Sequence, residues 1–275
     1  MADDSLEQPA RDPEPCDDRG RERTPTVVAL CASAGGLEAF KAFLTAMPAD
    51  SGMAFVLVPH LDPTHDSLLV DILSRCTSMS IGEAVDGEAV QANCVYVLPP
   101  NKYMTIAGGA LQLSGPVERG GPQTSIDLFL RSLADDQHGN SIGIVLSGSG
   151  AHGTSGLQAI KAAGGLVMVQ DPATAASDGM PRSAIDSGIA DFVLPVEQMP
   201  ERLMQHVDYG GGGLLDPEAP EVLETAAADL DAILALVKER TRVDFRGYRK
   251  KVLVRRVNRR MELGRFESLT DYLVH

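Results

Sequence analysis

The stretch TVVALCASAGG, residues 26–36, decides the fold predicted for this 275-residue chain. Residues 27–32 form an unbroken apolar run, which is typical of a parallel strand buried on both faces. Ser33 and the glycines at 35 and 36 form a tight turn, and a helix-like stretch begins at Gly36. The order strand, turn, helix opens a βαβ unit, so this stretch predicts an α/β fold.

The same alternation continues to Val207. Further strands are predicted at 54–60, 94–99, 141–147, 165–170 and 191–195, and helices at 36–47, 66–76, 124–137, 153–163 and 197–207. Residues 103–115 differ, because two short strands around Gly108 and Gly109 predict an antiparallel hairpin that flanks the sheet. The predicted fold class is a doubly wound, mainly parallel α/β sheet with an antiparallel hairpin, followed by a small all-α module.

Composition divides the chain into four parts. Residues 1–25 are rich in charge and proline, and we expect a disordered leader there. The α/β domain covers 26–207, a linker with four successive glycines covers 208–221, and a helical module covers 222–275. Two apolar stripes run along the helices of this module: Leu230, Ile233, Leu234 and Val237 on one, and Leu253, Val257 and Met261 on the other.

The formal net charge of −14 is unevenly distributed. Residues 238–265 hold 12 of the 24 basic side chains, so the rest of the chain is strongly acidic. An acidic chain is repelled by nucleic acid and anionic membranes, and 4% aromatic residues make poor stacking platforms, so we expect no nucleic-acid partner. The basic run 249–260 predicts an amphipathic helix with a cationic face, and the simplest interpretation is that this face is solvated.

Two classes of protein are excluded by what the sequence lacks. The N-terminal residues have no apolar signal core, and no apolar window is long enough to cross a bilayer, so we expect a cytoplasmic protein without membrane insertion. The cysteines form no C-x-x-C pair and have no histidine cluster beside them, so we expect neither a metal site, a cofactor nor a disulfide framework. These cysteines are Cys16, Cys31, Cys76 and Cys94.

Ser33 is the first candidate catalytic residue. It lies on the turn between the first strand and the first helix, at the sheet edge where open α/β folds place their sites. Gly35 and Gly36 allow a tight turn, and the amides at the start of the helix could stabilise an oxyanion. The pattern C-x-S-x-G departs from the usual G-x-S-x-G, and a phosphate-binding turn has the same appearance. On this motif alone, both interpretations stay open.

Two histidines follow other strands at the same edge. His60 ends the second strand, where it could be the general base that a serine nucleophile needs or simply a surface histidine. A dinucleotide-binding fold would have an acid there for the ribose, so His60 favours catalysis over nucleotide binding. His152 lies in LSGSGAHGTSG, residues 146–156, whose glycines indicate either an oxyanion loop or a tight turn.

These motifs together resemble a known family. In order and spacing they are similar to the CheB-type chemoreceptor glutamate methylesterase domain, in the version found in CheB/CheR fusions. DFRGYRKKVLVRRVNRRM, residues 244–261, is similar to the helical N-terminal subdomain of CheR. We expect no adenosylmethionine site of a complete methyltransferase within these 275 residues. The CheB-like motifs are CASAGG (31–36), PHLDPTH (59–65), PPNKYMTI (99–106), SIDLFLRSLA (125–134), LSGSGAHG (146–153) and DGMPRSAI (178–185).

The resemblance implies a serine hydrolase that acts on receptor glutamate methyl esters and on certain receptor glutamines. Its implied partners are methylated chemoreceptor cytoplasmic helices, with other signalling domains as further candidates. The similarity to CheR implies that the basic run 249–260 contacts acidic receptor or domain surfaces. By position, Ser33 corresponds to the nucleophile, His60 to the general base and His152 to the triad aspartate. A neutral His152 carries no negative charge to stabilise the His60 imidazolium, so we expect turnover to fall by about two to four decades.

The departures from the family pattern leave alternatives. Asp62 and Asp178 lie in neighbouring motifs and are candidates to replace the missing acid, although both are also ordinary loop aspartates. Cys31 replaces a glycine that is usual in the family and brings a Cβ close to the turn. The alternative function is a catalytically inactive sensory or docking module of a chemotaxis-like signalling protein.

Overall fold

A computed structural model describes residues 24–59, 68–115, 124–211, 227–242 and 269–274, and also residues 253, 257, 260, 261 and 266. Side chains of the helix that ends at 211 are described as far as 207. Nearly all of the predicted leader, most of the glycine-rich linker and most of the basic run therefore lie outside the described residues.

A seven-stranded sheet forms the centre of the α/β domain, in the order β3-β4-β2-β1-β7-β8-β9. All neighbouring pairs are parallel. Every residue of β1, β2, β7 and β8 is buried, as continuous apolar runs predict. The strands are β1 (Val27–Ala32), β2 (Ala54–Pro59), β3 (Ser80–Glu83), β4 (Cys94–Val97), β7 (Ile142–Val145), β8 (Leu166–Gln170) and β9 (Phe192–Leu194).

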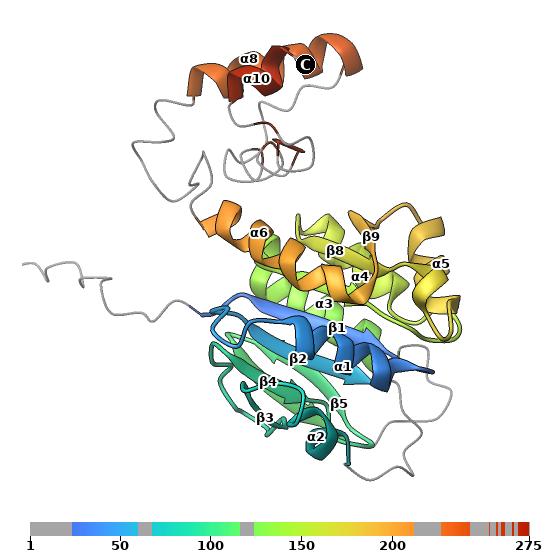
Figure 1. The fold of residues 1–275 in the computed structure, drawn as a ribbon. Coiled ribbons are helices and arrows are strands. Elements are labelled where there is room, and N and C mark those ends of the chain that lie inside the picture. Colours follow the sequence, from blue (N-terminus) through green and yellow to red (C-terminus); the bar gives the residue numbers. More distant parts are fainter. Residues whose placement is uncertain are drawn as a thin grey trace, which may run out of the picture.

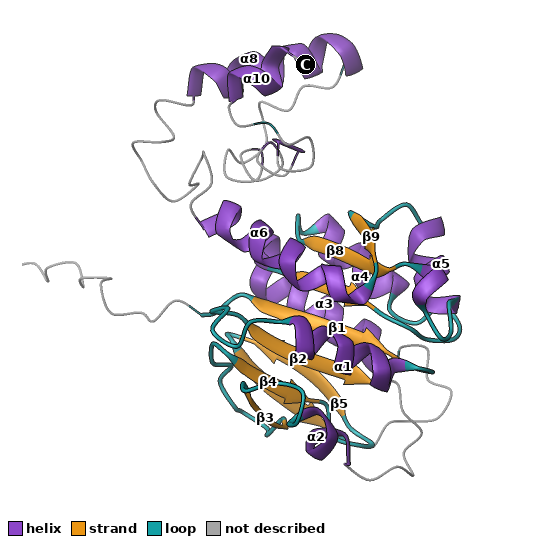
Figure 2. Ribbon diagram, viewed as in Figure 1, coloured by secondary structure: helices purple, strands orange, loops and turns teal. Residues whose placement is uncertain are grey.

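Helices cover both faces of this sheet (Figures 1 and 2). Alternate residues of β1 point to opposite faces, so Ala29 and Cys31 join one apolar cluster with α3, α4 and α5, whereas Leu30 and Ala32 join another with α1, α2 and α6. The predicted doubly wound fold is therefore confirmed. The helices are α1 (Gly36–Ala46), α2 (Leu68–Leu73), α3 (Ser125–Gln137), α4 (Thr154–Ala162), α5 (Gly179–Asp186) and α6 (Met199–Gly211).

The predicted hairpin is present as β5 (Tyr103–Ala107) and β6 (Ala110–Ser114), which pair antiparallel. Gly108 and Gly109 have φ angles of 60° and 73°, the left-handed values that a two-residue turn of this kind requires. The hairpin forms a separate sheet beside α3, where the Ile106 amide donates to the Ser132 hydroxyl at 3.1 Å.

One strand and one α-helix described in the α/β domain were not predicted, and one helix is longer than expected. The short 3₁₀ helices His138–Asn140 and Pro172–Thr174 were not predicted either. β3 is short and only partly buried, and α5 carries Gly179 and Pro181 in its first turn, where proline is compatible with a helix. α6 continues to Gly211 and so includes the start of the predicted linker, because a glycine in a helix costs only about 1 kcal/mol relative to alanine.

The two apolar stripes of the C-terminal module pack together. α8 (Ala227–Thr241) contributes one stripe and the residues at 253, 257 and 261 contribute the other. α10 (Leu269–Val274) packs against the cluster that they form. Among the helices that the structure describes, none combines the length and the apolarity needed to cross a bilayer.

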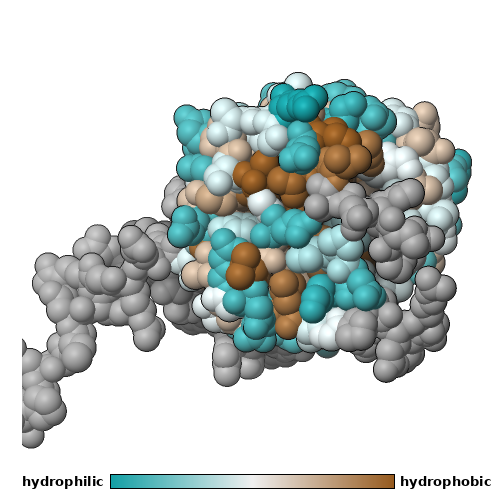
Figure 3. Space-filling model, turned by 90° about the horizontal axis from the view of Figure 1, so that it is seen from below, coloured by the Kyte–Doolittle hydropathy of each residue, from teal (hydrophilic) through white to brown (hydrophobic). Residues whose placement is uncertain are grey.

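The exposed large apolar side chains of the described residues come from different elements of the chain. In Figure 3, apolar areas of different size are separated by hydrophilic residues. Isolated exposed apolar residues are normal on a protein surface. Most large apolar side chains of the described α/β residues are buried in the two clusters beneath the helices. The exposed large apolar residues are Leu37, Leu68, Val85, Val193, Leu236 and Val274.

Candidate active site

The candidate site lies where the direction of chain winding reverses. β1 is at the middle of the sheet, with β2 on one side and β7 on the other. The chain after β1 leads to Ser33, and the chain after β7 leads to the glycine-rich loop with His152. In open α/β sheets a crevice forms at the carboxyl ends of two such strands, so the fold brings both loops to one edge.

The turn after β1 is held by backbone hydrogen bonds. The Ser33 amide donates to the Ser147 carbonyl at 2.9 Å, and the Gly36 amide donates to the Ser33 carbonyl at 2.9 Å. Gly35 caps α1 with a φ of 77°, and a Cβ there would lie 2.7 Å from Ser147 Oγ. Both the backbone conformation and the space therefore require glycine at 35.

The loop after β7 touches this turn directly. A Cβ on Gly148 would lie only 3.1 Å from Ser33 Cβ. The half-buried His152 lies over its own loop, since a Cβ on Gly150 would be 3.6 Å from its Nε2. Gly153 has a φ of 87° and caps α4, which starts at the next residue. The structure thus places the turn of Ser33 against the loop that carries His152.

His60 and Asp62 lie outside the described residues. The strand that precedes them ends at Pro59, which is the register partner of Ala32 in β1. Ser33 and His60 are therefore each the next residue after one member of the same pair. The expectation that the two strands deliver these residues to one edge rests on this register.

A third loop, between β8 and α5, completes the candidate site. The Gly148 amide donates to the Ser177 carbonyl at 2.9 Å, and the Met180 amide donates to the Gly148 carbonyl at 2.8 Å. A Cβ on Gly179 would lie 2.8 Å from the Gly150 nitrogen. The motif DGMPRSAI therefore packs against the loop of His152, a structural role that its sequence did not indicate.

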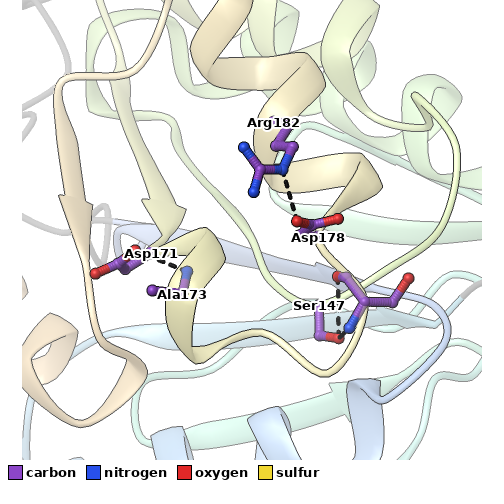
Figure 4. A network of polar contacts seen from close by, with 6 residues as sticks. Ser147, Asp171, Ala173, Asp178 and Arg182 are labelled. Atoms are coloured by element: carbon purple, nitrogen blue, oxygen red, sulfur yellow. Dashed lines mark hydrogen bonds and ion pairs between the residues drawn. The ribbon is translucent and has the colours of Figure 1, made fainter.

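Asp178, a candidate for the missing acid, is engaged with Arg182. Its Oδ2 accepts a hydrogen bond from Arg182 Nε at 2.6 Å, and Figure 4 shows this pair beside Ser147. The hydrogen bond with Asp178 raises the pKa of the Arg182 guanidinium above its usual value, and the charge of Asp178 adds to this effect. Both side chains are partly open to solvent, with exposed fractions of 43% and 63%.

Cys31 lies directly before the turn and is fully buried. Burial raises the pKa of its thiol above the usual range, and the charge of Asp127 adds to this. The thiol therefore stays protonated and is a poor competitor for the role of nucleophile. The free cysteines among the described residues are Cys31, Cys76 and Cys94.

Asp127 connects two helices next to the candidate site. Its Oδ1 accepts the Gly156 amide of α4 at 2.8 Å, and its Oδ2 accepts the Thr124 hydroxyl at 2.6 Å. It thereby ties the start of α3 to the helix that follows the loop of His152. Sequence reasoning missed this residue, because an aspartate in the first turn of a helix is ordinarily just a favourable charge.

In the described part of the chain, no group of three or more His, Cys, Asp or Glu could hold a metal ion.

Comparisons with known proteins cover most of the chain. The family model for the CheB methylesterase matches residues 28–203, and the model for the CheR methyltransferase all-alpha domain matches residues 228–275. The protein-glutamate methylesterase/protein-glutamine glutaminase 3 of Burkholderia orbicola is 34% identical over 196 residues, which cover 71% of this chain and 57% of that protein. The chain thus spans little more than half of that relative.

Two further comparisons concern the catalytic domain. A putative protein-glutamate methylesterase/protein-glutamine glutaminase of Leptospira interrogans is 34% identical over 183 residues, covering 63% of this chain and 91% of that protein. The crystal structure of the Thermotoga maritima CheB methylesterase catalytic domain has a TM-score of 0.61 and 28% identity, and covers 66% of this chain and 99% of that one. With the family model matching more than half of its residues, this chain belongs to the CheB methylesterase family.

Proposed function

We propose that this protein hydrolyses the methyl esters of glutamate side chains in the cytoplasmic helices of chemoreceptors, and deamidates certain receptor glutamines there. The observation that carries the proposal is the contact between the turn of Ser33 and the loop of His152 at the switch point of a CheB-type sheet. Its proposed place of action is the cytoplasm, with methylated receptor helices as partners and other signalling domains as further ones.

In the proposed mechanism, the Ser33 hydroxyl attacks the ester carbonyl while His60 accepts its proton. Methanol leaves with that proton, and water then hydrolyses the acyl-enzyme, with His60 again as the base. The amides of Ser33 and Gly36 already donate to the Ser147 and Ser33 carbonyls, so the amide of Ala34, the residue after the nucleophile, is the better candidate to stabilise the oxyanion. This division of roles follows the general scheme of serine hydrolases.

His152 should make this reaction slow. At the third position of a serine-hydrolase triad, an aspartate fixes the tautomer of the base and stabilises its imidazolium, and in serine proteases the loss of that charge lowers turnover by about 10⁴. A neutral imidazole can accept a hydrogen bond from His60 but supplies no negative charge. We therefore propose activity about two to four decades below that of a complete triad.

An inactive docking module is the second candidate function. Two observations favour it. Position 152, which corresponds to the triad acid, holds a histidine, and the carboxylate of Asp178 accepts a hydrogen bond from Arg182. A domain of this kind would bind the receptor helix through the same edge of the sheet without hydrolysing the ester.

Methanol release from a methylated chemoreceptor distinguishes the two functions. We expect slow release from the full chain, none from Ser33→Ala or His60→Gln, and a rise of about 10²–10⁴ in His152→Asp. His138→Asp is the matched control, because His138 lies after α3 and away from the candidate site. Release equal to that of Ser33→Ala would establish the docking module, and an unchanged rate in His152→Asp would show that the account of the third position is wrong.

A further inference from the structure

Ser147 is a buried serine at which the three loops of the candidate site meet. It follows β7 closely, and its exposed fraction is 1%. Its carbonyl accepts the Ser33 amide at 2.9 Å, and its own amide donates to Gln170 Oε1 at 2.8 Å. One residue therefore contacts the turn of Ser33 and the last residue of β8.

The hydroxyl of Ser147 adds the third connection. Its oxygen accepts the Ser177 amide at 2.9 Å, and its O–H donates to the Ala34 carbonyl at 2.7 Å, with the Ser177 carbonyl at 3.3 Å as a weaker acceptor. Figure 4 shows Ser147 between these loops, close to the Asp178–Arg182 pair. Every polar group of this residue is thus used to join segments that lie far apart in the sequence.

We propose that Ser147 is a positioning residue for the nucleophile Ser33. Ala34 and Gly35 are exposed, so little packing holds the turn from the solvent side. On its buried side, two hydrogen bonds with Ser147 hold the turn. The Ser33 amide donates to the Ser147 carbonyl, and the Ser147 hydroxyl donates to the Ala34 carbonyl. These bonds fix the backbone on both sides of the Ser33 Cα and so set where its hydroxyl points.

Gln170 holds Ser147 in turn. Gln170 is buried, with an exposed fraction of 4% for the residue. Its Oε1 accepts the Ser147 amide, and its Nε2 donates to the Thr174 carbonyl at 3.1 Å. Both ends of the amide are therefore satisfied, which fixes its orientation. The chain of contacts from Thr174 through Gln170 and Ser147 to Ser33 is continuous.

The chain offers a matched control for a lost hydroxyl. Ser141 directly precedes β7, as Ser147 follows it closely, and it is also buried, with an exposed fraction of 0%. Its hydroxyl donates to the His138 carbonyl, at the opposite edge of the sheet from Ser33. Ser141→Ala therefore removes the same group from a buried serine without touching the turn.

The test uses the full chain and two readouts, of which the second does not need activity. Because the role of Ser147 rests on the proposed esterase function, the first readout is methanol release. We expect Ser147→Ala to lower kcat by about 10- to 100-fold with KM within about twofold, since small misplacements of a nucleophile cost rates of this order. Ser141→Ala should keep kcat, and Ser147→Thr, which retains the hydroxyl, should recover most of it.

The second readout is hydrogen–deuterium exchange in the segment 33–36. We expect faster exchange there in Ser147→Ala than in Ser141→Ala, because the Ala34 carbonyl and the Ser177 amide lose their partner. Equal exchange in the two variants overturns the positioning role, whatever the activity. If the parent releases no methanol but exchange at 33–36 rises only in Ser147→Ala, the esterase proposal fails and the positioning of Ser33 stands.

Discussion

Gly148 and Met180 are in such close contact that a Cβ on Gly148 would lie 2.1 Å from Met180 Sδ. Met180, the second residue of α5, is fully buried, and its amide donates to the Gly148 carbonyl. The same Cβ would lie 3.1 Å from Ser33 Cβ. The absence of a side chain at 148 is therefore what lets α5, the loop after β7 and the turn of Ser33 come together.

Gly148→Ala should damage both stability and activity. Overpacking of this kind costs about 1–3 kcal/mol, so we expect a lower midpoint in urea unfolding and a loss of methanol release. Gly82→Ala is the control, because a Cβ on Gly82 in β3 has nothing within 4 Å. A Gly148→Ala variant as stable and active as Gly82→Ala would show that Met180 moves aside without consequence.

Asp127→Ala should destabilise the domain more than a surface aspartate does. The change leaves the buried Gly156 amide without its acceptor and removes the partner of the Thr124 hydroxyl, which we expect to cost about 1–3 kcal/mol. Asp135, exposed on the same helix, gives the matched variant Asp135→Ala. Chemical denaturation of both variants measures the difference, and equal stabilities would contradict the bridging role of Asp127.

The sequence predicted those parts of the fold whose pattern is local. β1 and β2 are continuous buried runs, and the Gly108-Gly109 turn requires left-handed backbone, so both signals are written in a few adjacent residues. β3 was missed because its four residues are only partly buried, and α5 because glycine and proline in its first turn normally suggest a loop.

The candidate site was predicted only as far as strand ends can predict it. Ser33 and His152 follow neighbouring strands, and the parallel sheet brings their loops together. Ser147, Gln170 and Asp127 escaped notice, because their roles depend on contacts across long stretches of chain. The bond from the Ser147 hydroxyl to the Ala34 carbonyl spans 113 positions, a distance over which periodicity and turn chemistry carry no information.

The thiol of Cys31 should make stability fall at alkaline pH. Burial raises its pKa in the folded state, so the folded protein holds this proton more tightly than the unfolded chain, in which a cysteine has a pKa of about 8.5. The contribution is complete below that pH and is lost progressively as pH rises above it towards the folded pKa, with a slope of up to about 1.4 kcal/mol per unit. Unfolding free energies at about pH 7.5 and 9.5, on either side of the unfolded pKa, should differ more in the parent than in Cys31→Ala. Equal differences would contradict the assignment.

Asp178→Asn should change methanol release by no more than about twofold. An exposed ion pair of this kind contributes little to stability, and the Asp178 carboxylate already accepts a hydrogen bond from Arg182 Nε. The alternative is that Asp178 turns away from Arg182 when substrate binds and supplies the charge that His152 lacks. In that case Asp178→Asn would lower kcat by decades, as loss of a triad acid does. Arg182→Gln separates the two cases further, because freeing Asp178 can raise kcat only if this carboxylate reaches His60. A matched pair of kinetic measurements, with Asp186→Asn as the control for a lost acid on the same helix, therefore decides whether the missing charge is replaced from α5 or is absent from the site.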